Sequence, residues 1–117
     1  MIKKKGGREV LFEIGIYLLS VLIVSFLWRD NTTTIVILAA LWIVAMIFWH
    51  DQRDLMIFIV AAIAGPLGEI IAIRFGVWSY ANPTFLGIPL WLPLLWGFFA
   101  MMLSKVATTI KYVEKKR

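Results

Sequence analysis

The sequence contains no cysteine, only one histidine, and little charge for its length. Without cysteine the chain forms no disulfide, no thiolate metal site and no cysteine nucleophile. The single histidine, His50, excludes a cluster of histidine ligands. Charged residues make up 16% of the chain and hydrophobic residues 62%, whereas soluble domains have about 25% and about 45–50%. These values exclude an ordinary soluble enzyme and a disordered chain, and they indicate a small integral membrane protein.

Four long apolar stretches account for most of the chain, and only Glu13 and Glu69 bring charge into them. At 1.5 Å per residue, each stretch matches the ~30 Å hydrocarbon core of a bilayer. Lipid accepts only helices or closed barrels, and the strict alternation of barrel strands is absent. Because most connections are short, consecutive helices should be antiparallel neighbours. We therefore predict one transmembrane domain over residues 1–117, an all-α integral membrane four-helix bundle with helices at about 10–28, 32–49, 55–75 and 88–110 and an outer loop at 76–87.

The basic residues gather at one end of this predicted bundle. With four helices both termini lie on the same side, and of the 12 Lys and Arg residues only Arg29 and Arg74 lie on the other side. Cytoplasmic ends of membrane proteins are enriched in Lys and Arg, so we expect both termini to be cytoplasmic, in a prokaryotic plasma membrane. The net charge of +5 then predicts membrane lipids as partners and requires no nucleic acid.

Glu69 is the most informative residue, because it is an acid deep within the third predicted helix. Such a carboxylate costs about 3 kcal/mol on insertion scales unless it is protonated, paired or facing a cavity. Its functional interpretations are a proton donor, a substrate anchor or an ion ligand, and its structural interpretation is a hydrogen-bonded tie between helices. Just before it, Pro66 predicts a kink in the helix. Gly65 and Gly68 allow close approach of another helix or a ligand.

The loop after this helix combines glycine and proline with aromatic residues. One interpretation is a belt of rings at the membrane interface. The other is a lid over Glu69, in which Tyr80 and Asn82 offer hydrogen bonds to Glu69 or to a ligand and the tryptophans of the fourth helix line the cavity. The residues of this predicted ligand-binding site are Glu69, Trp78, Tyr80, Asn82, Trp91 and Trp96.

A second polar cluster, His50, Asp51 and Asp54, lies between the second and third predicted helices. It offers few ligands at no recognised metal spacing. We interpret it as a solvated turn in which Asp51 or Asp54 caps the third helix. We therefore predict no metal site and no cofactor.

Residues 65–100 resemble the membrane carotenoid-biosynthesis proteins of the bisanhydrobacterioruberin hydratase type, and also small uncharacterised bacterial polytopic membrane proteins. The segments that carry the resemblance are Gly65-Pro66-Leu67-Gly68-Glu69, Gly76-Val77-Trp78-Ser79-Tyr80, Gly87-Ile88-Pro89-Leu90-Trp91 and Leu95-Trp96. The resemblance implies that Glu69, Trp78 and Tyr80 face an isoprenoid-like substrate.

Three functions remain open from the sequence. The first is binding of a lipid or isoprenoid-like ligand near Glu69, with or without turnover, so the sequence leaves enzyme activity undecided. The second is a small proton-coupled transporter or channel, which would need a homo-oligomer because four helices enclose little volume. The third is an accessory subunit of a larger membrane complex.

Overall fold

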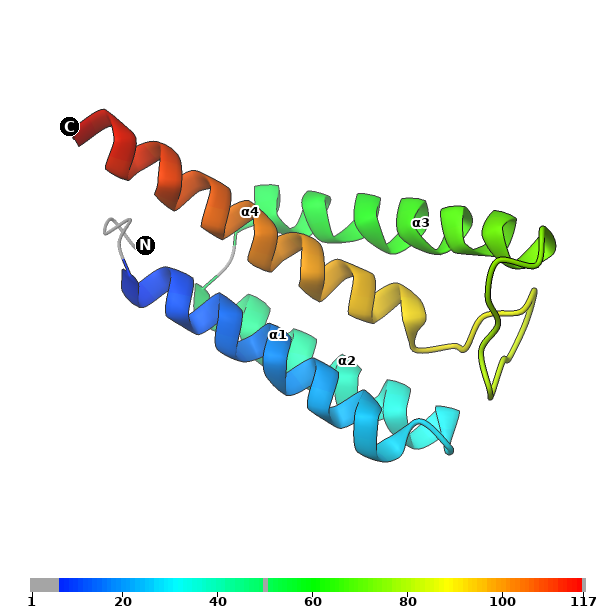
Figure 1. Cartoon of the computed structure of the whole chain (residues 1–117). Coiled ribbons are helices and arrows are strands. Elements are labelled where there is room, and N and C mark those ends of the chain that lie inside the picture. The colour runs from blue at the N-terminus through cyan, green and yellow to red at the C-terminus, as the bar shows by residue number, and fades with distance from the viewer. Residues whose placement is uncertain (1–6, 50, 117) are drawn as a thin grey trace.

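The computed structural model describes residues 7–49 and 51–116 and consists of four helices joined by turns and one long loop (Figure 1). Within the described residues the only extended pairing is an isolated bridge between Phe85 and Ile88. This confirms the predicted all-α, four-helix fold. The helices are α1 (Gly7–Leu27), α2 (Asn31–Trp49), α3 (Gln52–Arg74) and α4 (Leu92–Lys116).

Three of the helices are long and apolar enough to cross a membrane, namely α1 over Arg8–Leu27, α3 over its whole length and α4 over Leu92–Lys115. Helix α2 contains a shorter apolar segment, Asn31–Ile47. Large apolar side chains such as Phe26 and Ile47 are more than 70% exposed. An exposed apolar surface of this kind fits contact with lipid, because lipid tails are as apolar as the side chains themselves. The chain is therefore a helical membrane protein.

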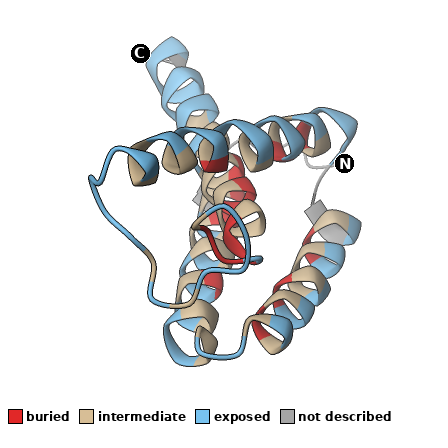
Figure 2. Cartoon of the chain, turned by 90° about the vertical axis from the view of Figure 1, so that its right-hand side faces the viewer, coloured by how far each residue is buried: buried red, intermediate tan, exposed pale blue. Residues whose placement is uncertain are grey.

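Helix α4 is the central element of the bundle. It packs against α3 on one side and against α1 and α2 on the other, and α1 packs on α2. Buried residues gather on α4 and on the helix faces turned toward it (Figure 2). Among the described helices, α3 packs extensively only against α4, although α2 is its neighbour in sequence. The start of α1 and the end of α4 lie at the same end of the bundle (Figure 1).

Helices α3 and α4 approach closely through two glycines, one on each helix. A Cβ atom built on Gly65 of α3 would lie 2.1 Å from Cδ2 of Trp96 on α4. A Cβ atom built on Gly97 of α4 would lie 2.5 Å from Cε2 of Phe58 on α3. Each glycine therefore receives a ring from the opposite helix. Helix α3 continues without a break through Pro66, so the predicted kink does not unwind a turn.

A buried ionic cluster ties three helices together near the start of α1. Lys105 Nζ of α4 lies 3.4 Å from Glu9 Oε2 of α1 and 3.3 Å from Asp54 Oδ2 of α3. All three side chains are at most 17% exposed. Removing one partner from a buried ion pair leaves an uncompensated charge, so this cluster holds the relative positions of the three helices.

Asp51 caps the N-terminus of α3, as the sequence predicted for this turn. Its carboxylate accepts a hydrogen bond from the Asp54 backbone N–H at 3.1 Å, and the Asp54 carboxylate accepts from the Asp51 backbone N–H at 3.3 Å. This reciprocal arrangement is a capping box, here closed by aspartate. The backbone hydrogen bond from Asp54 lowers the pKa of Asp51 below its usual value. His50, the third member of the predicted cluster, lies outside the described residues.

The loop between α3 and α4 is longer than predicted, because α4 begins at Leu92 rather than at residue 88. A tight turn accounts for the delay. Leu86 and Gly87 at its centre both have positive φ, 51° and 88°, and the Ile88 N–H donates to the Phe85 carbonyl at 2.9 Å. Two central residues with positive φ are typical of a type I′ turn. Ile88 still belongs to this turn, because it pairs with Phe85 in the isolated bridge, so the helix cannot begin at residue 88.

Candidate functional site

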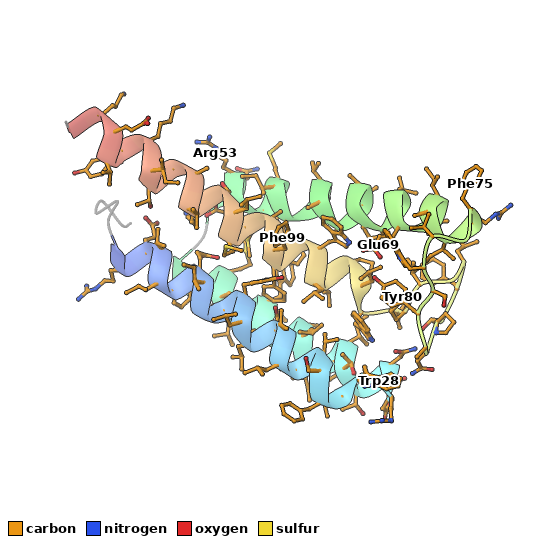
Figure 3. All side chains as sticks on the ribbon, viewed as in Figure 1. Trp28, Arg53, Glu69, Phe75, Tyr80 and Phe99 are labelled. Carbon is orange, nitrogen blue, oxygen red and sulfur yellow. The ribbon has the colours of Figure 1, made fainter. Side chains whose placement is uncertain are left out.

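Glu69 on α3 is held by two neutral hydrogen-bond donors from different parts of the chain. The Tyr80 hydroxyl in the loop donates to Glu69 Oε1. The indole N–H of Trp96 on α4 donates to Glu69 Oε2 at 2.7 Å. Figure 3 shows Glu69 and Tyr80 close together between α3 and α4. One donor on each oxygen leaves further lone pairs of the carboxylate free for a ligand.

The position of Trp96 follows from the glycine beside it. The indole lies directly on the α3 backbone at Gly65, where any side chain would collide with it. Gly65 and Glu69 are four residues apart and therefore lie on the same face of the helix. An indole ring lying over Gly65 can reach one turn further and donate to Glu69. Gly65 thus positions Trp96, and Trp96 positions the carboxylate.

The position of Tyr80 follows from the anchoring of the loop to the turn between α1 and α2. Asn82 Nδ2 donates to the carbonyls of Trp28 and Arg29, both at 3.0 Å. In return, Asn31 Nδ2 donates to the Asn82 carbonyl at 2.9 Å. The Tyr80 ring also meets Trp91 edge to face, with 6.2 Å between their centroids. Loop residues fixed in this way hold the Tyr80 hydroxyl against Glu69, and this hydrogen bond is one that the sequence predicted.

Two cavities meet at Glu69. A groove of about 570 Å³ lies between α3 and α4, and Ala61, Ala64, Gly68 and Trp78 line it. A second cavity of about 270 Å³ lies on the α1 side of Trp96. The side chains that border both spaces are Glu69, Trp96 and Phe99. The carboxylate and its indole partner therefore form part of the wall between the groove and the cavity.

The structure separates the predicted site residues into two groups. Glu69, Tyr80 and Trp96 come together in one hydrogen-bonded unit, and Trp78 lines the groove beside them. Asn82 and Trp91 instead line a separate space of about 220 Å³ beneath the loop. Asn82 bonds to backbone carbonyls rather than to Glu69. Its amide donates to the carbonyl groups of the α1–α2 turn, which lack a hydrogen-bond donor from the helix.

Two aromatic residues of the second cavity, Tyr17 and Phe99, were absent from the sequence prediction. Their rings lie 5.6 Å apart and tilted by 56°. Phe99 could have been inferred, because it follows Trp96 by three residues and so shares its face of α4. Tyr17 carries the weaker signal of a ring with a polar hydroxyl in the middle of a largely aliphatic helix.

The electrostatic setting of Glu69 differs from that of the acids near the start of α1. Glu9 and Asp54 share the cation of Lys105. No ion pair joins Glu69 to a basic side chain within residues 7–49 and 51–116. Burial, and then the hydrogen bond to Glu69, raise the pKa of Tyr80 well above its usual value. The phenol therefore stays protonated and acts as a donor at neutral pH.

No group of three or more acidic or histidine side chains suited to a metal ion occurs in the described part of the chain. Glu69 stands as a single carboxylate among aromatic rings. Such a site can accept hydrogen bonds or attract a cation, and its apolar walls favour an organic ligand.

Comparison with known proteins identifies one protein family. Its sequence model, described as Protein of unknown function (DUF2878), matches residues 9–112. No curated protein and no solved structure matches the chain. The family description names no activity, so the isoprenoid substrate that the sequence resemblance implied has no support from these comparisons.

Proposed function

The chain belongs to the DUF2878 family of proteins of unknown function, and we propose that it binds an amphiphilic, lipid- or isoprenoid-like molecule within the membrane. The ligand lies in the groove between α3 and α4, with a polar group at Glu69. In this proposal both termini are cytoplasmic, and membrane lipids are the partners of the chain.

The observation that carries the proposal is the groove itself. Its α3 wall includes Ala61, Ala64, Gly65 and Gly68, whose positions i, i+3, i+4 and i+7 place them on one helix face. A Cβ atom built on Gly68 meets nothing within 4 Å. Side chains this small leave about 570 Å³ along the helix. A flexible or isoprenoid chain fits a long apolar groove of this kind.

The polar end of the groove orients the proposed ligand. Ligand sites combine apolar walls with a few fixed polar groups that set direction and specificity. Here Glu69 is fixed by Tyr80 and Trp96, so it needs no reorganisation to accept a hydrogen bond from a hydroxyl group of the ligand. Trp78, which is 47% exposed, covers the same end of the groove.

The proposal is tested by extracting the lipids that copurify with the protein and identifying them by mass. Wild-type protein in mild detergent should retain one apolar species at least tenfold enriched over the membrane from which it was solubilised, as measured by mass spectrometry. Gly68→Leu should lose this enrichment, because leucine fills the groove. Recovery of bulk phospholipid alone from the wild type would contradict the proposal.

Gly15 provides the matched control for this substitution. It also lies within a helix, on α1, and a Cβ atom there also meets nothing within 4 Å. Gly15→Leu adds the same bulk outside the groove, so it should keep the copurified species. Equal loss in both variants would indicate a general effect of leucine on the fold and would count against a site in the groove.

A further inference from the structure

We propose that the 270 Å³ cavity on the α1 side of Trp96 is a binding site for an organic cation such as a quaternary ammonium group. This goes beyond the proposed function, because it concerns a different space and a ligand of defined charge. The groove and the cavity share Glu69, Trp96 and Phe99. Beyond these, small residues of α3 line the groove, whereas Tyr17 of α1 and Tyr80 of the loop line the cavity.

Aromatic rings and one carboxylate border the cavity, and each of them contacts the next. Tyr17 meets Phe99 at 5.6 Å between centroids, and Phe99 meets Trp96 at 5.9 Å. Trp96 then donates to Glu69, and Glu69 accepts from Tyr80. All five residues line the same cavity. Four rings and one acid therefore line a single space.

The angles between the rings suit a cation. Trp96 and Phe99 meet at 88°, and Tyr17 is tilted by 56° to Phe99. None of these rings is stacked face to face on its neighbour, and aromatic residues gathered around one space bind quaternary ammonium groups through the negative faces of the rings. Each contact of this kind is worth about 0.5 to 2 kcal/mol, depending on how well water is excluded.

The carboxylate of Glu69 also favours a cation as the ligand of the cavity. Among the residues that the structure describes, Glu69 receives hydrogen bonds only from neutral groups, whereas Lys105 compensates Glu9 and Asp54. A carboxylate without a counter-ion is costly in a membrane-spanning segment. A cationic ligand would supply the missing positive charge. A single carboxylate among rings lacks the several oxygen ligands that Ca²⁺ or Mg²⁺ requires, so an organic cation fits better.

The test measures binding of benzyltrimethylammonium to the full chain in a neutral detergent by calorimetry and tryptophan fluorescence. Phenylmethanesulfonate, an anion of similar size, is the probe of opposite charge. The wild type should bind the ammonium ion and show at least tenfold weaker binding of the sulfonate. Glu69→Gln should weaken ammonium binding at least tenfold. Equal binding of both probes, or no binding of either, would overturn the proposal.

Tyr17 allows the ring itself to be tested, because it lines the cavity and not the groove. Tyr17→Phe keeps the ring and should keep the affinity for ammonium. Tyr17→Leu removes the ring and should weaken binding about two- to thirtyfold, which is the range of a cation–π contact. Equal affinity in these two variants would exclude binding of the cation by the aromatic rings. Circular dichroism checks that both remain helical.

The groove variant separates this inference from the proposed function. Gly68→Leu fills the groove without touching the cavity, so ammonium binding should be unchanged while the copurified lipid is lost. Loss of ammonium binding in Gly68→Leu would place the cation in the groove and refute the cavity site. Retained ammonium binding in a wild-type protein that holds no enriched lipid would support the cavity and contradict the proposed function.

Discussion

Gly65 and Gly68 are three residues apart on α3, yet alanine should have opposite effects at the two positions. At Gly65 the new Cβ atom would lie 2.1 Å from Cδ2, 2.5 Å from Cγ and 2.6 Å from Cε2 of Trp96. These atoms lie near the base of the indole, which cannot move without a new side-chain conformation or a separation of α3 from α4. At Gly68 the new Cβ atom meets nothing within 4 Å.

The magnitude at Gly65 follows from three contributions. Overpacking of a close contact costs about 1 to 3 kcal/mol. Displacement of the indole breaks its 2.7 Å hydrogen bond to Glu69, which is partly buried, and an unsatisfied partner inside the protein costs up to about 1 to 3 kcal/mol. Alanine is a better helix former than glycine by about 1 kcal/mol, which offsets part of the loss. We expect Gly65→Ala to lower the free energy of unfolding by about 1 to 5 kcal/mol.

Gly68→Ala should instead leave the free energy of unfolding unchanged or raise it by up to about 1 kcal/mol, because only the helix preference acts there. The assay is reversible unfolding in mixed micelles of mild and denaturing detergent, followed by circular dichroism and tryptophan fluorescence. If Gly65→Ala were as stable as Gly68→Ala, the close approach of Trp96 to the α3 backbone would be wrong, and with it the way in which Glu69 is positioned.

Two further predictions concern the polar groups at the end of the bundle where α1 begins. Lys105→Met should lower the free energy of unfolding by about 3 to 5 kcal/mol, because Glu9 and Asp54 lose their shared cation inside the bundle. The control is Lys111→Met, at an exposed position of α4, which should have no measurable effect in the same unfolding assay. Hydrogen bonding lowers the pKa of Asp51 in the folded state. The ionised cap therefore stabilises the fold at pH values above the unfolded pKa of ~4, and this stabilisation is lost as the pH falls through the folded pKa. Thermal unfolding between pH 2 and pH 7 should therefore show a smaller acid-induced loss in Asp51→Asn than in the wild type, and identical pH profiles would refute the cap.

The number and length of the helices could be predicted from the sequence because the bilayer imposes them. An apolar stretch must be long enough to cross the hydrocarbon core, and polar residues mark where it ends. The acid of the third helix and its tyrosine partner could also be foreseen, since Glu69 stands out in an apolar stretch and Tyr80 follows in a loop rich in turn residues.

The walls of the cavity could not be predicted in the same way. Apolar residues are spread around α1 and α2, so their hydrophobic pattern carries little signal for which face turns inward. On α1 the acids Glu9 and Glu13 mark one buried face. Tyr17 reaches the cavity, and Gly97 receives Phe58, only because of how α1, α3 and α4 are rotated about their own axes. That rotation is set by contacts between side chains of different helices, which no single stretch of sequence contains.

The start of α4 was mispredicted for a local reason. The segment 88–91 is apolar and reads as part of the last helix. Leu86, a residue that rarely adopts positive φ, is nevertheless held at 51° by the turn that it shares with Gly87. Ile88 pairs with Phe85 across this turn, so the loop is longer than its composition indicates.

The two ends of the bundle are fastened by different means, and this determines the route to Glu69. At one end Lys105 joins α1, α3 and α4, and at the other the amides of Asn31 and Asn82 join the loop to the α1–α2 turn. The ligand that we propose for the groove would therefore reach the carboxylate sideways, between α3 and α4, after first partitioning into the bilayer. Its occupancy would then follow its mole fraction in the membrane, and its concentration in water would matter only through the partition coefficient.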